Sequence, residues 1–336
     1  MKPKISVLMS VYNGENFLKE SIDSILTQTF SDFEFIIVND GSNDLTGEIL
    51  ASYKDFRLKI FSIKNRGLSA ALNYGLEYCS TELVMRMDAD DISYPHRFAA
   101  LLEDWEIAGQ PDVFGSGVDY INENGKKLWS VNMPLDDATI RTALCSYKGQ
   151  MAIMHPTVLL RKSSVLSCGG YDSYFKIGQD NDLWIRMAAN SRFGNSPQRL
   201  LKYRFQPSSD TAMAISRSVD DFRMIGCLMK LLSLHKKILI DAGEETLWNI
   251  CRDQIISVLI KRIDISALKD EEAVSRGLTE VKILIYSRKF IAGILKFWTL
   301  YCQYSTIVLN RVFKHKVNGV SIDMLSLEEL RRISSH

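Results

Sequence analysis

The feature of this sequence that most constrains its fold is the alternation of short apolar runs with segments of helical spacing. The apolar runs lie at residues 5–11, 33–38, 58–63, 83–87 and 113–118, and the helical segments at 16–29, 43–54 and 68–79. This alternation predicts an α/β fold in which a mostly parallel sheet carries helices on both faces. Ligands of such sheets lie beyond the carboxyl ends of the strands.

Three of these strand-like runs end in polar residues. Tyr12 and Asn13 follow the first run, Asp40 follows the second, and the acidic segment 88–91 follows the fourth. Because the carboxyl ends of parallel strands meet at one edge of a sheet, the sequence predicts that the three polar clusters converge on one rim.

The remainder of the chain has two parts of different character. Residues 113–205 are less regular, whereas the sequence after about residue 212 has helical spacing, few glycines and no proline. Pro207, Ser208 and Ser209 cluster between them. We therefore predict an α/β domain at 1–207 and a helical C-terminal extension at 208–336.

Composition argues against several classes of protein. The 336 residues carry 41 Lys and Arg against 40 Asp and Glu, and this balance gives no support for nucleic-acid binding. The six cysteines form no CxxC pair, which argues against a zinc ribbon, and they suit a reducing cytosol. The run at 5–11 is too short for a signal peptide, and no apolar stretch reaches 18 residues. We therefore expect a cytoplasmic protein without a transmembrane helix.

The acidic segment 88–91 (DADD) suggests a metal site. Three carboxylates in four residues repel one another unless a positive charge lies among them. Mg²⁺ or Mn²⁺ takes one or two protein carboxylates and completes its shell with water and substrate phosphates. From the spacing alone, an acidic loop without a ligand is an equally good interpretation.

Four other polar residues each allow a structural and a functional interpretation. Asp40 could accept a hydrogen bond from a nucleobase or form an Asx turn ahead of the helix at 43–54. Tyr12 could stack on a base or close the end of the sheet. A lone histidine such as His155 is more often structural than a ligand. Asp180 could cap the following helical stretch or act as a general base.

A series of motifs, taken in order and spacing, resembles the family 2 glycosyltransferases, which have the A-type glycosyltransferase fold. The resemblance covers about residues 3–205. The motifs are 6–15 (SVLMSVYNGE), 24–29 (SILTQT), 34–42 (EFIIVNDGS), 65–68 (NRGL), 71–73 (ALN), 87–91 (MDADD), 95–97 (PHR), 155–157 (HPT), 169–172 (GGYD) and 179–184 (QDNDLW).

The resemblance implies transfer of a sugar from a nucleotide donor, usually a UDP-sugar, with inversion at the anomeric carbon. It implies that Tyr12 and Asp40 hold the uracil and that Asp88 contacts the ribose or base. The motif positions expected to bind the nucleotide-sugar are Tyr12, Asn13, Glu15, Asp40, Asn65, Arg66, Asp88, Ala89 and Arg97.

The resemblance also assigns the metal and the base. Asp90 would bind the Mn²⁺ or Mg²⁺ ion that bridges the diphosphate, and His155 resembles a position that can contact the metal or the diphosphate. Asp180 would deprotonate the acceptor hydroxyl. A metal suits this site, since bare carboxylates would repel a diphosphate and a cation stabilises the charge on the leaving UDP.

Two positions depart from the family pattern. The acidic pair is often Glu-Asp and here is Gln179-Asp180, which removes a neighbouring charge that could raise the pKa of Asp180. Asp182 is the next candidate base. An arginine often precedes the asparagine of the 71–73 motif, and here Leu72 does. A contact to the donor phosphates is therefore missing, or is supplied by Arg66 or Arg97.

Two alternative functions remain open from the sequence. A sugar-nucleotide pyrophosphorylase normally opens with a Gly-rich phosphate loop, and residues 5–16 contain only Gly14. A catalytically silent sugar-nucleotide-binding protein is the other alternative. Gln179 favours it, whereas the intact Asp88, Asp90 and Asp180 speak against it.

The C-terminal extension suggests contact with a membrane. Residues 281–322 carry basic and aromatic residues and no acidic residue, which is typical of a helix on an anionic membrane surface. A helix that packs on the catalytic domain is the alternative. Membrane contact suits a glycan acceptor linked to undecaprenyl diphosphate, as in relatives that build O-antigen or capsule, and a peripheral location on the inner face of the cell membrane. The chain lacks the QxxRW motif and multiple spans of processive synthases.

Overall fold

The computed structural model describes residues 3–146, 152–173 and 178–205, together with residues 240, 243 and 245. The predicted boundary near 207–212 and almost all of the C-terminal extension, including 281–322, lie outside these residues. Within the described part, no helix has the length and apolar character needed to cross a membrane.

The first half of the fold follows the predicted alternation of strands and helices. Each predicted element is present, with ends that move by a few residues. The elements are β1 (Ile5–Val11), α1 (Leu18–Leu26), β2 (Phe33–Asn39), α2 (Thr46–Ser52), β3 (Leu58–Ser62), α3 (Leu68–Tyr78) and β4 (Leu83–Asp88).

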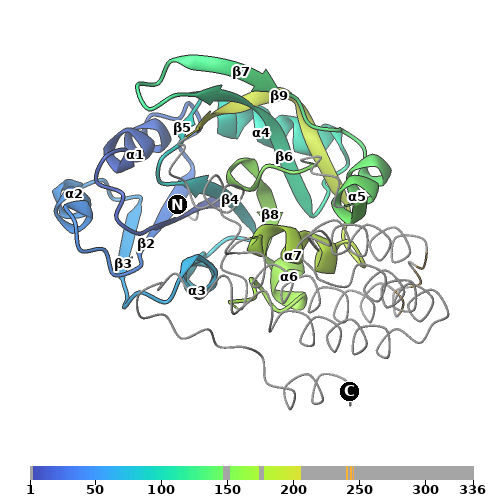
Figure 1. Ribbon diagram of the computed structural model, residues 1–336, viewed down its shortest axis with the longest axis horizontal. Helices are drawn as coiled ribbons and strands as arrows, with labels where there is room; N and C mark the ends of the chain where they lie inside the picture. Colours follow the sequence, from blue (N-terminus) through green and yellow to red (C-terminus); the bar gives the residue numbers. More distant parts are fainter. Residues whose placement is uncertain are drawn as a thin grey trace, which may run out of the picture. The chain divides into compact units, whose positions relative to one another are not determined.

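The second half contains strands and helices of unequal length in a less regular order (Figure 1). The elements are β5 (Ile92–Ser93), α4 (Arg97–Ile107), β6 (Val113–Ile121), β7 (Lys127–Val131), α5 (Asp137–Ser146), the 3₁₀ turn η1 (His155–Thr157), β8 (Leu159–Arg161), α6 (Lys162–Ser167), α7 (Gln179–Met187) and β9 (Phe193–Arg204).

The strands of the described part form one mixed sheet with the order β3-β2-β1-β4-β8-β6-β9-β5, and β7 pairs with β6. The four strands β3, β2, β1 and β4 are parallel, as predicted. The sheet then continues through antiparallel pairs of β8 with β4 and β6, and β6 pairs in parallel with β9. The alternation in the first half did not predict this antiparallel extension.

Helices cover both faces of the sheet, as expected for strands that are buried throughout. Ile5, Val7 and Met9 belong to one core cluster with residues of α1, α2 and α4. Leu8, on the opposite side of β1, belongs to a second cluster with residues of α3, α5, α6 and α7. Successive side chains of a strand point to opposite faces, and this explains why one strand feeds two cores.

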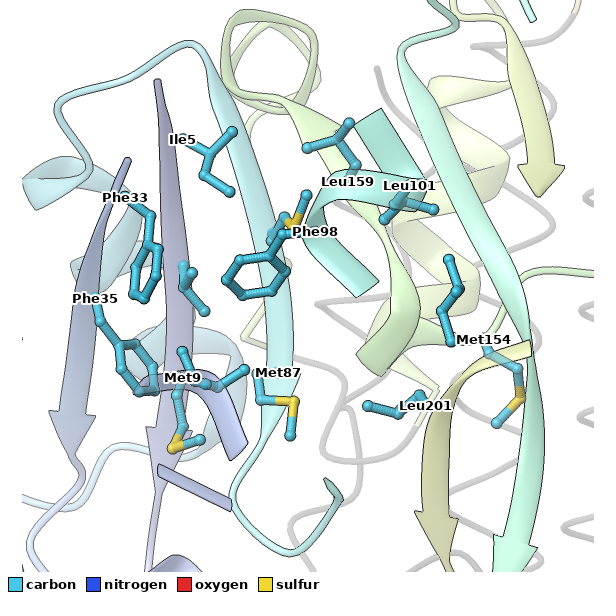
Figure 2. Packing of buried hydrophobic residues seen from close by; sticks show 14 of the residues in the cluster. Ile5, Met9, Phe33, Phe35, Met87, Phe98, Leu101, Met154, Leu159 and Leu201 are labelled. Atoms are coloured by element: carbon cyan, nitrogen blue, oxygen red, sulfur yellow. The ribbon is translucent and has the colours of Figure 1, made fainter. Parts of the chain in front are cut away.

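Aromatic packing joins α4 to the strands in the first cluster. Figure 2 shows Phe98 of α4 beside Phe33 of β2, among Ile5, Met87 and Leu159. The two rings meet edge to face, with centroids 5.4 Å apart and planes at 87°. This is a favourable arrangement of two aromatic quadrupoles, and it fixes α4 against the sheet.

The register of the parallel strands brings their carboxyl ends to one level. Val11 pairs with Asn39 across β1 and β2, and Ser10 pairs with Asp88 across β1 and β4. The residues that follow these strands therefore emerge side by side at one edge of the sheet.

Candidate active site

A cavity of about 330 Å³ lies at this edge of the sheet. Its lining joins the loop after β1 to the loop after β4, so the predicted convergence of these two polar clusters is confirmed. Tyr12 is 52% exposed there, which leaves its ring available for stacking. The lining residues are Ser10, Val11, Tyr12, Asn13, Gly14, Asn16, Phe17, Asp88, Ala89 and Asp90. Five of these were not among the predicted site residues: Ser10, Val11, Gly14, Asn16 and Phe17.

The loop after β1 is held by the loop after β2. The Asn13 backbone N–H donates to Ser42 Oγ at 2.9 Å, and Asn13 Oδ1 accepts from the Asn43 N–H at 3.0 Å. Asn13 has a φ of +52°, a left-handed conformation that asparagine tolerates well. The Glu15 carboxylate accepts from the Leu45 N–H at 2.9 Å. Asn13 and Glu15, predicted to bind the donor, thus also shape the loop that carries Tyr12.

Asp40 joins the same edge and organises the start of α3. Its carboxylate is 2% exposed and accepts the backbone N–H groups of Arg66 and Gly67, each at 2.8 Å. The structural interpretation of Asp40 placed it ahead of the next helix, whereas the structure links it to the loop before α3. Asn65 and Arg66 are exposed in that loop. Asp40 does not line the cavity, and its predicted contact with the base remains a prediction.

Two buried arginines lie beneath the acidic loop. Arg86 is 1% exposed, and its guanidinium donates to the Asp88 carboxylate and to the Met87 carbonyl. Arg97 is fully buried and donates to the Arg86 and Pro156 carbonyls at 2.8 Å each. The structure therefore does not bring Arg97 to the cavity as a direct donor contact, because its side chain is enclosed between β4 and η1.

Burial and the like charges of the acidic loop together raise the pKa of one of its members, Asp91. Asp91 is 1% exposed, and burial raises its pKa well above the usual value, with the negative charges of Asp90 and Asp88 acting in the same direction. The Asp91 carboxylate accepts the backbone N–H of Arg204 at 2.9 Å. The mutual repulsion expected from the DADD spacing is present, and the buried Arg86 opposes it.

Asp180 and Asp182 lie in the first turn of α7 but have different surroundings. Burial raises the pKa of Asp180, and the nearby charge of Asp88 acts in the same direction. The missing Glu at position 179 therefore does not leave this carboxyl with an ordinary pKa. Asp182 is fully buried, and its Oδ2 accepts from Arg186 Nε at 3.0 Å and Nη2 at 2.6 Å. Asp182 is thus an internal ion-pair partner, and the interpretation of Asp182 as a reserve base is wrong.

His155 is enclosed in an aromatic environment. It is 6% exposed, its Nε2 lies 2.8 Å from the Tyr171 hydroxyl, and its ring meets Trp184 edge to face. Burial, followed by the charge of Arg86, lowers the pKa of His155 well below its usual value, so the ring is neutral at pH 7. A metal at His155 would have to bind Nδ1 or displace the tyrosine, and the metal contact remains a prediction.

The family-atypical Leu72 is a core residue here. It is fully buried in the second cluster, which also contains Trp184. Its neighbour Asn73 exchanges two hydrogen bonds with the Tyr171 backbone, at 2.7 and 2.8 Å, and so ties α3 to the segment beside His155. The predicted replacement of a missing phosphate contact by Arg97 is not supported by this geometry, whereas Arg66 remains exposed.

The sequence interpretation missed Arg86 and Arg204 as residues of this site. Arg86 interrupts an otherwise apolar strand directly before the acidic segment. A lone charge in a buried strand must be paired, so the sequence could have predicted that Arg86 binds the acidic segment that follows it. Arg204 ends a strand that was not recognised in the sequence.

We predict that Asp40→Asn destabilises the protein. An asparagine offers one carbonyl oxygen and places an NH₂ group against the second peptide N–H, which leaves that donor without an acceptor. The free energy of unfolding in urea should fall by about 1–3 kcal/mol. Glu48→Gln, at an exposed position of α2, is the control and should leave it unchanged. Wild-type stability of Asp40→Asn would show that the carboxylate does not hold the loop before α3.

Comparison with known proteins places this site in a family. Residues 6–167 match the model of Glycosyl transferase family 2. The chain is 34% identical over 224 residues to the O-antigen biosynthesis glycosyltransferase WbnJ of Escherichia coli, covering 63% of this chain and 84% of that protein. It is 32% identical over 205 residues to an E. coli UDP-Gal:alpha-D-GlcNAc-diphosphoundecaprenol beta-1,3-galactosyltransferase, covering 59% of this chain and 73% of that protein.

Solved structures share the fold at low sequence identity. The crystal structure of S. aureus TarS 1-349 in complex with UDP matches with a TM-score of 0.60 and 16% identity, over 95% of this chain and 94% of that chain. The same protein in complex with UDP-GlcNAc matches with a TM-score of 0.61 and 18% identity, over 86% and 81%. The family model matches the part of the chain that forms most of the sheet and the lining of the cavity, and this chain covers most of each E. coli relative. The chain therefore belongs to glycosyltransferase family 2.

Proposed function

We propose that this glycosyltransferase moves a sugar from a UDP-sugar to a hydroxyl of a glycan acceptor, with inversion at the anomeric carbon. The observation that carries the proposal is the composition of the cavity, whose lining includes the exposed Tyr12 together with Asp88 and Asp90. An aromatic ring can stack on the base of a nucleotide. Carboxylate oxygens can bind a divalent cation, which in turn binds the diphosphate. The S. aureus TarS structures in complex with UDP and UDP-GlcNAc support the same donor class.

The acidic loop fits a divalent cation that is shared with the substrate. In the described part of the chain, no three His, Cys, Asp or Glu side chains gather into a complete metal cage. Mg²⁺ and Mn²⁺ at phosphates commonly use one or two protein carboxylates, and Asp90 is proposed as the principal one. The ion would neutralise the charge that develops on the leaving diphosphate. Arg86 donates to the Asp88 carboxylate and so orients the residue that is expected to contact the ribose or base.

Asp180 is proposed as the general base. An inverting displacement needs one group that takes the acceptor proton on the side opposite the leaving nucleotide. Asp180 lies at the start of α7, where the charges of Asp88 and Arg86 both act on it. A raised carboxyl pKa makes it a stronger base than an exposed aspartate, provided that it is ionised at the working pH.

The acceptor is proposed to be a saccharide on a lipid diphosphate, in surface polysaccharide synthesis. Two relatives support this: one is named for O-antigen biosynthesis, and the name of the other specifies a GlcNAc-diphosphoundecaprenol acceptor. The donor sugar and the linkage are decided by a screen of UDP-sugars against lipid-diphosphate acceptors, with the product linkage determined by NMR. Absence of sugar transfer from every UDP-sugar would contradict the proposal.

We predict opposite outcomes for two neighbouring carboxylates of α7. Asp180→Asn should fold normally and lower kcat by about 10²–10⁴, because the acceptor proton loses its base. In the wild type, kcat should fall as the pH drops through the raised pKa of Asp180, and this acidic limb should disappear in the variant. Asp182→Asn should instead destabilise the fold, since Arg186 loses its buried partner, by up to about 3–5 kcal/mol. Near wild-type turnover of Asp180→Asn would assign the base elsewhere.

We predict that donor turnover requires a divalent cation held by Asp90. Asp90→Ala should abolish UDP release in the presence of acceptor, and excess EDTA should do the same to the wild-type enzyme, with activity restored by added Mn²⁺ or Mg²⁺. Glu106→Gln, an exposed carboxylate of α4, is the control and should retain activity. Full turnover in excess EDTA would contradict a metal-dependent mechanism.

We also propose that the basic and aromatic segment 281–322 holds the enzyme on the inner face of the membrane. Binding to anionic vesicles should then exceed binding to neutral vesicles and weaken with salt, because charge attraction at a surface is screened over about 8–10 Å at physiological ionic strength. Reversal of charge at Lys289, Lys296 and Arg311 should release the protein. Equal sedimentation with both kinds of vesicle would contradict this membrane contact.

A further inference from the structure

Arg204, the last residue of β9, uses its side chain to bind several other segments of the chain. It is 3% exposed, and its Nε donates to the Asp90 carbonyl at 2.7 Å. Its Nη1 donates to the carbonyls of Asn122 and Glu123 in the β6–β7 turn, at 3.1 and 2.6 Å. Its Nη2 donates to Glu20 Oε2 of α1 at 2.6 Å. Four N–H···O contacts from one guanidinium therefore join three separate segments of the chain.

Two further contacts bring the same residue to the acidic loop and to the cavity wall. The Arg204 backbone N–H donates to Asp91 Oδ1 at 2.9 Å, next to the Asp90 carbonyl that Nε holds. The guanidinium also lies over the ring of Phe17, 4.3 Å from its centroid, and Phe17 lines the cavity. Arg204 thus binds the Asp90 carbonyl with its side chain and the Asp91 carboxylate with its backbone, and its guanidinium also contacts Phe17 of the cavity lining.

The acidic loop needs such an anchor for a physical reason. Three carboxylates in four residues repel one another, and in isolation they would favour a loop that spreads its charges apart. The direction of the Asp90 side chain follows from the backbone conformation at Asp90, and Arg204 binds that backbone at its carbonyl. The Arg204 guanidinium is itself paired with Glu20, and this ion pair holds it in place beside the Asp90 carbonyl.

We propose that Arg204 is a positioning residue for the donor site. It fixes the Asp90–Asp91 peptide so that the Asp90 side chain is presented to the diphosphate of the donor, and it does so without contacting the donor itself. This inference rests on the proposed function of the cavity lined by Asp88 and Asp90. It assigns a role in donor binding to a residue 113 positions beyond the acidic loop in the sequence.

Arg204→Lys is the informative variant, because lysine keeps the charge and loses the planar fork that reaches three segments. Amide hydrogen exchange over residues 88–92 should become faster in this variant. UDP affinity in the presence of Mn²⁺, measured by calorimetry, should fall by about 10–100-fold, as is usual when the support of a metal ligand is removed. UDP affinity without Mn²⁺ should change by less than about twofold, because the base contacts are untouched. Arg199→Lys, in the same strand and paired with Asp119, is the matched control and should leave all three quantities unchanged.

The outcomes separate this inference from the proposed function. Wild-type Mn²⁺-dependent UDP affinity in folded Arg204→Lys overturns the inference, even if exchange is faster. A uniform loss of UDP affinity with and without Mn²⁺ overturns it too, because that indicates a general structural role. If Arg204→Lys does not fold, Glu20→Gln decides: a weaker, Mn²⁺-dependent loss supports the inference, and wild-type affinity overturns it. If the wild type binds no UDP, the proposed function fails, and the inference that rests on it fails with it. If the wild type binds UDP with Mn²⁺ and Arg204→Lys binds it equally well, the inference alone fails.

Discussion

The parallel pairing of β1 with β2 and β4 is the constraint on which the site depends. The register places Val11 beside Asn39 and Ser10 beside Asp88, so the following loops leave the sheet at the same level. A slip of one residue would turn the core-facing side chains of a strand to the opposite face and is therefore strongly disfavoured. The hydrophobic pattern of three buried strands thus decides where Tyr12, Asp40 and the acidic loop meet.

The site also depends on the balance of charge between the acidic loop and the buried arginines. The carboxylates of Asp88, Asp90 and Asp91 are concentrated in one loop beside a cavity. The guanidinium of Arg86 binds the Asp88 carboxylate, and that of Arg204 binds the Asp90 carbonyl. A buried arginine needs partners for its N–H groups, and both of these donate to a backbone carbonyl and to a carboxylate, although Arg86 Nε has no hydrogen-bond partner. The same contacts that stabilise the arginines give the loop a defined shape, which a donor site requires.

The sequence predicted the part of the fold that rests on local pattern. The first seven elements follow from the periodicity of apolar residues, and the convergence of Tyr12 with the acidic loop follows from the strand order. The mixed half of the sheet was not predicted. Its antiparallel strand β8 has only three residues, and β9 pairs in parallel with β6 across about 80 residues and contains buried polar residues such as Asn195 and Ser196. No alternation in the sequence marks such a strand.

The roles of residues were harder to predict than their positions. A motif shows where a residue lies in the chain, but it does not show where the side chain points. Asp180 and Asp182 are two residues apart on a helix, so their side chains point to different sides. One is therefore beside the charges of the site and the other is paired inside with Arg186. Arg97 is a second example. Its motif position predicted a donor contact, but its side chain points to the buried carbonyl of Pro156.

The most direct test of this account is a crystal structure of the full chain with UDP and Mn²⁺, in which anomalous scattering locates the metal. The account predicts that the diphosphate occupies the cavity between the loops after β1 and β4. The uracil should lie against the ring of Tyr12, and the manganese peak should lie beside Asp90. A nucleotide bound at another edge of the sheet, or a manganese peak remote from Asp88 and Asp90, would contradict the account.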